Sequence, residues 1–326
     1  MSQKSVARFL PVVAGCVALL GAPGCITIDL AALGDKSMRE TVIAGQRGPK
    51  LALIEVDGLL TAQPDRNWIG VETQSTVGRV KEQLDMARRD DDVRAVLLRI
   101  DTPGGTATAS ELLYHEVLKF KKERGIPVHA QLMGTATSGG YYLAMATDRV
   151  VAHPTTITGS IGVIFVGVEI SGLMSKLGIS DQTVTGGKFK DAGSPLRPRT
   201  PAEMAHFQAI IDDLHEVFRD RVDRGRPGLD RAQVDALADG RIFSAPQARD
   251  AGLVDAIGSI DDTVDAIRNR LGASEIRVVR YHRPQEWRRT AYDRGPEAPV
   301  LNVDLGSLLQ PPGTPGFHYL WWPGAH

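Results

Sequence analysis

The chain has 326 residues, of which 42% are apolar and 24% charged, and its 38 Lys and Arg against 39 Asp and Glu give a net charge of −1. This composition excludes a largely disordered chain, and the absence of a basic excess argues against a nucleic-acid-binding protein. The length allows one large domain or two small ones.

The N-terminal segment has the pattern of an export signal. Two basic residues precede an apolar stretch, residues 9–20, which is too short to span a bilayer comfortably. Small residues then directly precede Cys25, as in bacterial lipoprotein signals. We therefore interpret residues 1–24 as a signal peptide of the lipoprotein type, Cys25 as the lipidated residue and residues 25–49 as a linker.

An uncleaved N-terminal membrane anchor is the alternative interpretation of this segment. Both interpretations predict an exported protein that is anchored to a membrane on its periplasmic or extracytoplasmic side. Cleavage before Cys25 would remove Cys16, and lipid would occupy the other thiol. We therefore expect neither a disulfide framework nor a cysteine-based metal site.

From residue 51 onward, predicted strands and helices alternate. Apolar runs predict strands at 51–56, 93–100 and 127–133, and helical spacing of apolar residues follows the first two. Thr108 and Glu111 predict a capping box at the start of the second helix, which Gly125 ends. Repeated βαβ units predict an α/β fold with a parallel sheet and flanking helices.

Two loops whose residues could take part in catalysis follow predicted strands, at the edge where such folds bind ligands. Residues 101–105 read Asp-Thr-Pro-Gly-Gly, a turn whose glycines can direct bare N–H groups outward to bind an oxyanion. Ser138 precedes an apolar run that predicts a helix, so its hydroxyl and the Gly139 amide would lie at the positive end of a helix dipole. The pattern indicates a nucleophile beside an oxyanion hole; the alternative is a plain turn or helix N-cap.

A nucleophilic serine needs a base. None of the eight histidines lies in a loop that resembles a catalytic one, and no G-x-S-x-G motif is present. A desolvated lysine is the other option, and Lys188 and Lys190 lie in the glycine-bracketed loop at residues 186–195. The alternative interpretation is that both lysines are ordinary solvated charges on the protein surface.

Five segments carry a resemblance to a known family. In chain order they are Asp-Thr-Pro-Gly-Gly at 101–105, Thr-Ser-Gly-Gly-Tyr-Tyr at 137–142, Thr-Gly-Ser-Ile-Gly-Val at 158–163, Lys-Asp-x-x-Ser-Pro at 190–195 and Asp-Gly-Arg-Ile-Phe at 239–243. Together they resemble the signal peptide peptidases of the S49 family of serine peptidases, which have the ClpP/crotonase fold. The resemblance covers about residues 50–272, and we place the peptidase domain at 50–282.

The resemblance implies a Ser–Lys dyad in which Ser138 is the nucleophile and Lys190 the general base. It further implies that the Ser160 hydroxyl orients the lysine amine and that Gly105 and Gly139 donate to the oxyanion. No metal or other cofactor is implied. The expected protein is a membrane-tethered endopeptidase of the single-length type that hydrolyses signal-peptide remnants and other small apolar peptides. Its active sites would lie at protomer contacts of a homo-oligomer.

Two other function classes remain open from the sequence. An acyl-CoA enzyme of the crotonase type would share the fold and the oxyanion hole, although an exported chain would not meet coenzyme A. A non-catalytic scaffold is disfavoured because both dyad residues are present.

The C-terminal third of the chain supplies packing and a tail. Residues 200–203 predict a capping box at the start of a helix whose apolar stripe, Phe207, Ile211, Leu214 and Phe218, indicates core burial or an interface. Residues 283–326 form a tail rich in Pro and Trp, with seven prolines and three of the four tryptophans. This tail is interpreted as a loosely packed strap, an interfacial membrane anchor or a self-peptide lying in the substrate groove.

Overall fold

The computed structural model describes residues 37–66, 72–284, 290 and 317–321, all within one compact unit. The predicted signal peptide and Cys25 lie outside the described residues, as does most of the tail. In the part of the chain that is described, no helix combines the length and hydrophobicity needed to cross a membrane.

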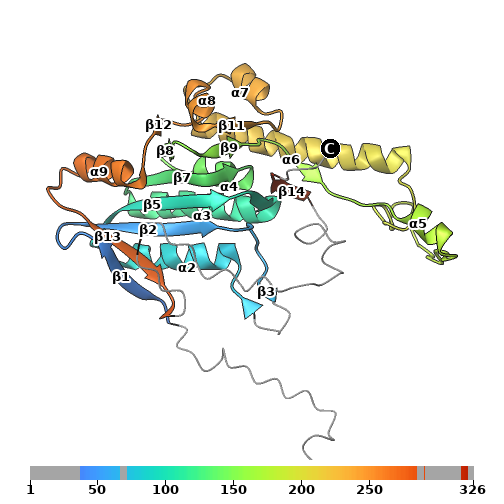
Figure 1. Ribbon diagram of the computed structural model, residues 1–326, viewed down its shortest axis with the longest axis horizontal. Helices are drawn as coiled ribbons and strands as arrows, with labels where there is room; N and C mark the ends of the chain where they lie inside the picture. The colour runs from blue at the N-terminus through green and yellow to red at the C-terminus, as the bar shows by residue number, and fades with distance from the viewer. Residues whose placement is uncertain (1–36, 67–71, 285–289, 291–316, 322–326) are drawn as a thin grey trace, which may run out of the picture. The chain divides into compact units, whose positions relative to one another are not determined.

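A nine-stranded sheet forms the centre of the fold (Figure 1). Across its main path the strands are β1 (Arg39–Ala44), β13 (Arg277–His282), β2 (Lys50–Asp57), β5 (Val93–Thr102), β7 (Val128–Thr137), β8 (Arg149–Ala152) and β12 (Ala256–Ile257). Two further strands lie off this path: β9 (Ile157–Gly159) pairs with β7, and β11 (Ile242–Ser244) pairs with β9. Every pair on the main path except β1 with β13 is parallel, which confirms the predicted fold class.

The sheet begins earlier in the chain than the sequence patterns indicate. Strand β1 lies within the segment interpreted as a linker, and it pairs antiparallel with β13, Val42 opposite Val279. Only alternate residues of β1 are partly buried, so the strand lacks the continuous apolar run that predicts a central strand. It covers one edge of the sheet.

Helices cover both faces of the sheet, so β2 and β5 are buried on both sides. The helices are α2 (Thr76–Arg89), α3 (Ala107–Arg124), α4 (Gly139–Ala144), α5 (Ser171–Lys176), α6 (Pro201–Gly225), α7 (Arg231–Leu237), α8 (Ala245–Asp250) and α9 (Ile260–Arg270). Ala52 and Ile54 of β2 belong to the core that includes α2 and α3, whereas Leu51 and Leu53 pack with Ile267 of α9. Alternate residues thus face opposite layers, which explains why these runs are largely apolar.

The helix ends partly follow the predictions. Helix α6 begins with the expected capping box between Thr200 and Glu203, and Gly125 ends α3 in the left-handed conformation with φ of 62°. The capping box predicted at Thr108 is wrong. The N-cap is Thr106, whose hydroxyl accepts from the Ala109 amide, because pairing of residues 104–106 with other strands fixes where the helix begins.

Three short strands form a second sheet in the order β10 (Ile164–Phe165), β14 (Phe317–Leu320) and β6 (Gly104–Thr106). A two-stranded ribbon, β3 (Asp65–Arg66) and β4 (Glu72–Thr73), completes the described strands. Residues 166–200, which we call the arm, connect β10 to α6 and include α5; Figure 1 shows the arm extending from the N-terminal end of α6, away from the main sheet. The tail therefore contributes one strand beside β6, which carries two of the predicted loop glycines.

The apolar stripe of α6 is only partly buried in this chain. Phe218 is fully buried, but Phe207, Ile211 and Leu214 are half-exposed. Phe207 stacks on Phe165 of β10 with ring centroids 4.6 Å apart. The N-terminal half of α6 is thus a surface that supports β10 and remains open on its other side.

His129 makes the stability of this fold sensitive to acid. Its ring lies in β7, is 2% exposed and has no hydrogen-bond partner among the described residues. Burial and the positive charges of Arg270 and Arg149 lower its pKa to about 4, against the opposing effect of Asp148 and Asp255. The folded protein therefore holds the ring neutral, and this contribution to stability is lost as the pH falls from about 6.5 towards 4.

We expect His129→Leu to retain about 2 kcal/mol more of its unfolding free energy than the wild type when the pH is lowered from 7.5 to 4.5, because the unfolded wild type takes up a proton on this ring that the folded state resists. Urea unfolding at both pH values measures the difference. His115→Leu is the matched control, since His115 lies exposed on α3 and should leave the acid dependence unchanged. Equal acid losses in the wild type and His129→Leu would contradict this account.

Candidate active site

Ser138 lies at the junction of β7 and α4 in a strained backbone conformation. Its φ and ψ are 52° and −114°, in a region that residues with a side chain rarely adopt. Its amide donates to the Gly159 carbonyl at 2.7 Å, and its carbonyl accepts from the Tyr142 amide at 2.8 Å. These bonds hold the turn on both sides, so the surrounding structure maintains the strain.

The Ser138 hydroxyl is not used for helix capping. Although Ser138 occupies the N-cap position of α4, its side chain makes no capping bond, and its Oγ is buried without a hydrogen-bond partner among the described residues. A plain N-cap serine would satisfy this oxygen with the amide of the second or third helical residue. The geometry therefore favours a reactive hydroxyl over the structural alternative.

Glycines from two loops meet beside this serine. A Cβ placed on Gly104 would lie 2.9 Å from the Gly139 amide nitrogen, so the turn at 103–105 packs directly on the first residue of α4. Gly105 is held by Leu60, whose carbonyl would lie 2.1 Å from a Cβ at that position. Thr102 orders the turn, because its hydroxyl accepts from the Gly104 amide at 3.0 Å. The structure thus brings the predicted oxyanion donors, Gly105 and Gly139, into one region.

Ser160 also reaches this region. Gly159, its neighbour, accepts from the Ser138 amide, and Ser160 itself has a positive φ of 52°. The Ser160 amide donates to the Arg241 carbonyl at 2.8 Å, which ties the segment at 158–163 to the one at 239–243. Both serines with a positive φ therefore directly follow strands that pair with each other, β7 and β9, which supports a common functional reason for the strain.

A hydrogen bond between the buried Tyr142 and the half-exposed Glu111 supports the helix that follows Ser138. The Tyr142 hydroxyl donates to the Glu111 carboxylate, which also accepts from Arg221 at 2.7 Å. Burial and the adjacent Glu111 carboxylate raise the pKa of Tyr142 well above its ordinary value. Burial alone would raise the pKa of Glu111, but the hydrogen bonds from Arg221 and Tyr142 outweigh it and lower that pKa. Tyr142 thus stays protonated and fixed in place.

Lys190 lies in the arm and is exposed. No hydrogen bond joins Lys190 to Ser138 among the described residues, and the Ser138 Oγ has no partner there. The Lys190 amide donates to the Gly187 carbonyl at 3.1 Å, which closes a tight turn. Lys188 is also exposed, with its Nζ 5.4 Å from the centre of the Phe189 ring. Within the described chain, the predicted nucleophile and base are therefore on separate elements that do not meet.

Arg197 fixes the loop that carries Lys190, a role that the sequence analysis missed. Its Nε donates to the carboxylate of Asp191 at 2.7 Å, and its Nη1 donates to Glu203 at 3.0 Å. Hydrogen bonds from Arg197 and from the Thr200 backbone lower the pKa of Glu203 to about 2. The sequence held one signal for this role: Arg197 lies six residues after Asp191 and six before Glu203, so an arginine stands midway between two acidic residues.

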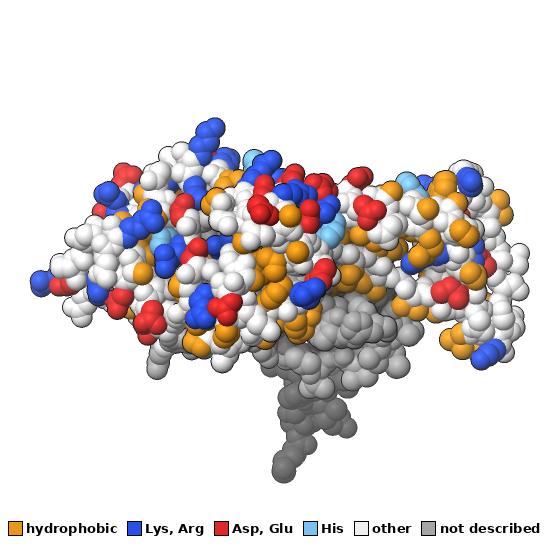
Figure 2. All heavy atoms as spheres, turned by 90° about the horizontal axis from the view of Figure 1, so that it is seen from above, with side chains coloured by type: hydrophobic (Ala, Val, Ile, Leu, Met, Phe, Trp, Pro, Cys, Tyr) orange, Lys and Arg blue, Asp and Glu red, His pale blue; other side chains and the backbone are white. Residues whose placement is uncertain are grey.

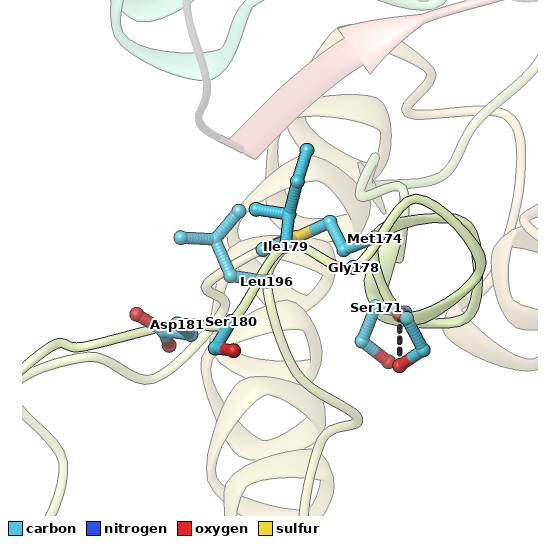
Figure 3. A pocket seen from close by; sticks show the side chains of 8 residues that line it. Ser171, Met174, Gly178, Ile179, Ser180, Asp181 and Leu196 are labelled. Carbon is cyan, nitrogen blue, oxygen red and sulfur yellow. Dashed lines mark hydrogen bonds between the residues drawn. The ribbon is translucent and has the colours of Figure 1, made fainter.

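The arm also exposes apolar side chains and contains a shallow hollow of about 310 Å³. Figure 3 shows Met174, Ile179 and Leu196 close together in this hollow. Figure 2 shows hydrophobic side chains spread over the arm, at the right of that view. The exposed members are Val168, Leu173, Leu177, Ile179, Val184 and Phe189. The residues that line the hollow include neither Ser138 nor a lysine, so it is a surface feature distinct from the region around Ser138.

Comparison with known proteins gives a consistent assignment. Residues 120–274 match the Peptidase family S49. The chain is 34% identical over 242 residues to the putative signal peptide peptidase SppA of Enterococcus faecium, covering 74% of this chain and 70% of that protein. A putative protease of Methanocaldococcus jannaschii is 36% identical over 198 residues, with coverage of 61% and 63%. The chloroplastic serine protease SPPA of Arabidopsis thaliana is 30% identical over 207 residues, and the match covers 30% of its length.

Proposed function

The chain belongs to peptidase family S49 and is a serine peptidase, and on this basis we propose that Ser138 and Lys190 form its catalytic dyad. The observation that carries the proposal is the strained Ser138, whose buried hydroxyl has no hydrogen-bond partner in the part of the chain that the structure describes and lies beside the glycine-rich turns. Family membership favours peptide hydrolysis over the acyl-CoA chemistry that the sequence left open.

The proposed reaction is an acyl transfer in two steps. Lys190, as a neutral amine, takes the Ser138 proton while Oγ attacks the peptide carbonyl, and then donates that proton to the leaving amine. Water hydrolyses the acyl-enzyme with the same base. The Gly105 and Gly139 amides hold the oxyanion, and each such donor contributes about 3–4 kcal/mol in serine hydrolases. Ser160 orients the lysine amine in this scheme.

A fluorophosphonate probe tests the nucleophile directly, because only an activated serine reacts with it. We expect a single adduct on the peptide that contains Ser138, located by mass spectrometry. Ser160→Ala should slow the labelling without moving the adduct, since Ser160 acts on the base and does not itself react. An adduct on another serine, or none on the folded wild type, would refute the proposal.

We propose that the substrates are signal-peptide remnants and other small apolar peptides. The support is the name of the Enterococcus faecium relative, a putative signal peptide peptidase, together with the export pattern at the N-terminus. An enzyme that is exported and membrane-anchored on the periplasmic or extracytoplasmic side would meet such peptides where they are released. Cleavage of synthetic signal peptides by the purified full chain tests this assignment.

The proposed membrane tether is a lipid on Cys25. We expect Cys25→Ser to release most of the protein from the membrane fraction, because in this proposal the lipid serves as the tether once residues 1–24 are removed. Fractionation followed by intact-mass measurement checks this. Cys16→Ser is the matched control and should remain lipidated and bound. A Cys25→Ser chain that stays on membranes with residues 1–24 attached would instead support the uncleaved anchor.

We further propose that the protein is a homo-oligomer in which Lys190 of one protomer serves Ser138 of its neighbour. Two features of the described chain support this arrangement. Lys190 does not meet Ser138 within the chain, and the arm that carries it exposes apolar side chains, among them Val184 at 95% exposure. Apolar surface of this kind is characteristic of protein interfaces. The half-exposed stripe of α6 lies at the base of the same arm.

A further inference from the structure

Strand β14 of the C-terminal tail, Phe317–Leu320, is bound in the way that a peptide ligand is bound. Strand β14 lies between β10 and β6 and pairs antiparallel with both. The pairing places His318 opposite Ile164 on one side and Tyr319 opposite Gly105 on the other. An extended segment that adds to exposed strand edges on both sides is the way many proteins bind peptides.

In this register, the N–H group of Gly105 points towards β14. Leu60 lies on the opposite side of β6, where its amide donates to the Gly104 carbonyl at 2.9 Å and its carbonyl accepts from Thr106 at 3.1 Å. Because backbone groups alternate in direction along a strand, the N–H of Gly105 points the other way, towards Tyr319. The Trp321 amide donates to the Pro103 carbonyl at 2.9 Å, which fixes the same alternation one pair further along.

The Tyr319 carbonyl lies against Gly104, the neighbour of Gly105, and near Gly139, one of the two oxyanion donors in the proposed mechanism. Its oxygen would be 2.0 Å from a Cβ built on Gly104 and 3.2 Å from one built on Gly139. The approach to Gly104 is possible only because this residue lacks a side chain, and the approach to Gly139 is also tighter than most contacts of a Cβ. The carbonyl of one tail residue thus lies beside the turn that follows Ser138.

The Tyr319 side chain fills an aromatic pocket. It is 1% exposed and lies on Tyr142 with ring centroids 5.0 Å apart, and Phe218 is 4.9 Å away. Its hydroxyl donates to the Leu214 carbonyl at 2.8 Å. The pocket therefore offers aromatic surface along its walls and one hydrogen-bond acceptor at its end, which together suit a tyrosyl side chain.

We propose that β14 occupies the substrate groove, with Tyr319 at the position of the residue on the acyl side of the cleaved bond. Two consequences follow. The tail inhibits its own enzyme by competition, and the pocket around Tyr142 selects peptides with tyrosine at the acyl position. The inference rests on the proposed function, since it identifies Gly105 and Gly139 as the oxyanion donors.

The test uses full-length variants and two peptides. Tyr319→Ala empties the pocket, so hydrolysis of a fluorogenic peptide with tyrosine at the acyl position should increase about tenfold or more, because an intramolecular competitor acts at high effective concentration. Tyr319→Phe retains the ring and should stay inhibited. The blocked peptides Phe-His-Tyr-Leu and Phe-His-Ala-Leu should differ, with only the first inhibiting Tyr319→Ala strongly. Intact masses should show residues 320–326 retained; their Ser138-dependent loss would also support this placement.

A binding measurement separates this inference from the proposed catalysis. The full-length double variant Ser138→Ala/Tyr319→Ala should bind fluorescent Phe-His-Tyr-Leu at least about tenfold more tightly than Phe-His-Ala-Leu, as measured by anisotropy. Equal affinity for the two peptides, or equal hydrolysis by wild type and Tyr319→Ala, would overturn the inference. Selective binding without any hydrolysis or serine labelling would instead refute the proposed function and leave the groove assignment standing.

Discussion

Ser138→Ala and Lys190→Ala each lower peptidase activity by roughly ten-thousand-fold or more, whereas Lys188→Ala retains most of it. This is the result we expect, because the nucleophile and the base act as a unit and loss of either removes nearly the whole chemical contribution. The measurement is kcat/KM on a fluorogenic peptide, with circular dichroism and thermal melts to show that each variant folds. Ser138 replacement should also abolish fluorophosphonate labelling.

Lys188 is a sharp control for the choice of base. It lies two residues from Lys190 in the same exposed loop and carries the same charge, so a general electrostatic role of the arm would affect both variants alike. Its ammonium group already lies near the Phe189 ring. Equal losses from Lys188→Ala and Lys190→Ala would rule out our assignment of the base.

The protonation state of the base gives the same experiment a second readout. An amine accepts a proton only when it is neutral, so activity should rise towards alkaline pH. Lys190→Arg preserves the positive charge and the length of the side chain but holds its proton throughout this range, so it should be as inactive as Lys190→Ala. An active Lys190→Arg enzyme would show that the residue provides charge alone.

The fold was predictable where burial leaves a local signature. The strands at 51–56 and 93–100 are largely apolar because α2 and α3 cover one face and α9 the other. The start of α3 was not predictable in this way. Thr108 and Glu111 have the spacing of a capping box. The pairing of β6 with β14 nevertheless extends to Thr106 and makes that residue the N-cap of α3.

The site was predictable as a set of loops but not as an arrangement. The positions of Gly105 and Ser138 followed from their place after buried strands. The pairing of Phe317–Leu320 with residues more than 150 positions earlier has no local signal in the sequence. A four-residue segment in a proline-rich tail is too short to show a repeating pattern of apolar residues. Partnership between Ser138 and Lys190 likewise depends on geometry that no spacing encodes.

Mixing two inactive variants should restore activity if the dyad is shared between protomers. In a Ser138→Ala chain the lysine is intact, and in a Lys190→Ala chain the serine is intact. When subunits exchange, some contacts place Lys190 of a Ser138→Ala chain beside Ser138 of a Lys190→Ala chain. Such a contact contains a complete dyad. Random assembly of a 1:1 mixture makes such contacts roughly a quarter of the total, so about that fraction of wild-type activity should return.

The exposed arm is the physical reason to expect this result over a dyad within one chain. Burying side chains such as Val184 and Phe189 against a neighbour would desolvate the loop that carries Lys190, which is the condition that keeps a lysine amine neutral. Oligomerisation would then build the site and activate its base in one step, and activity should fall on dilution below the dissociation constant. Ser138→Ala mixed with the double variant Ser138→Ala/Lys190→Ala is the matched control and must stay inactive. If native mass spectrometry shows mixed oligomers and the complementing pair remains inactive, the lysine serves the serine of its own chain, and the arm must fold back to reach it.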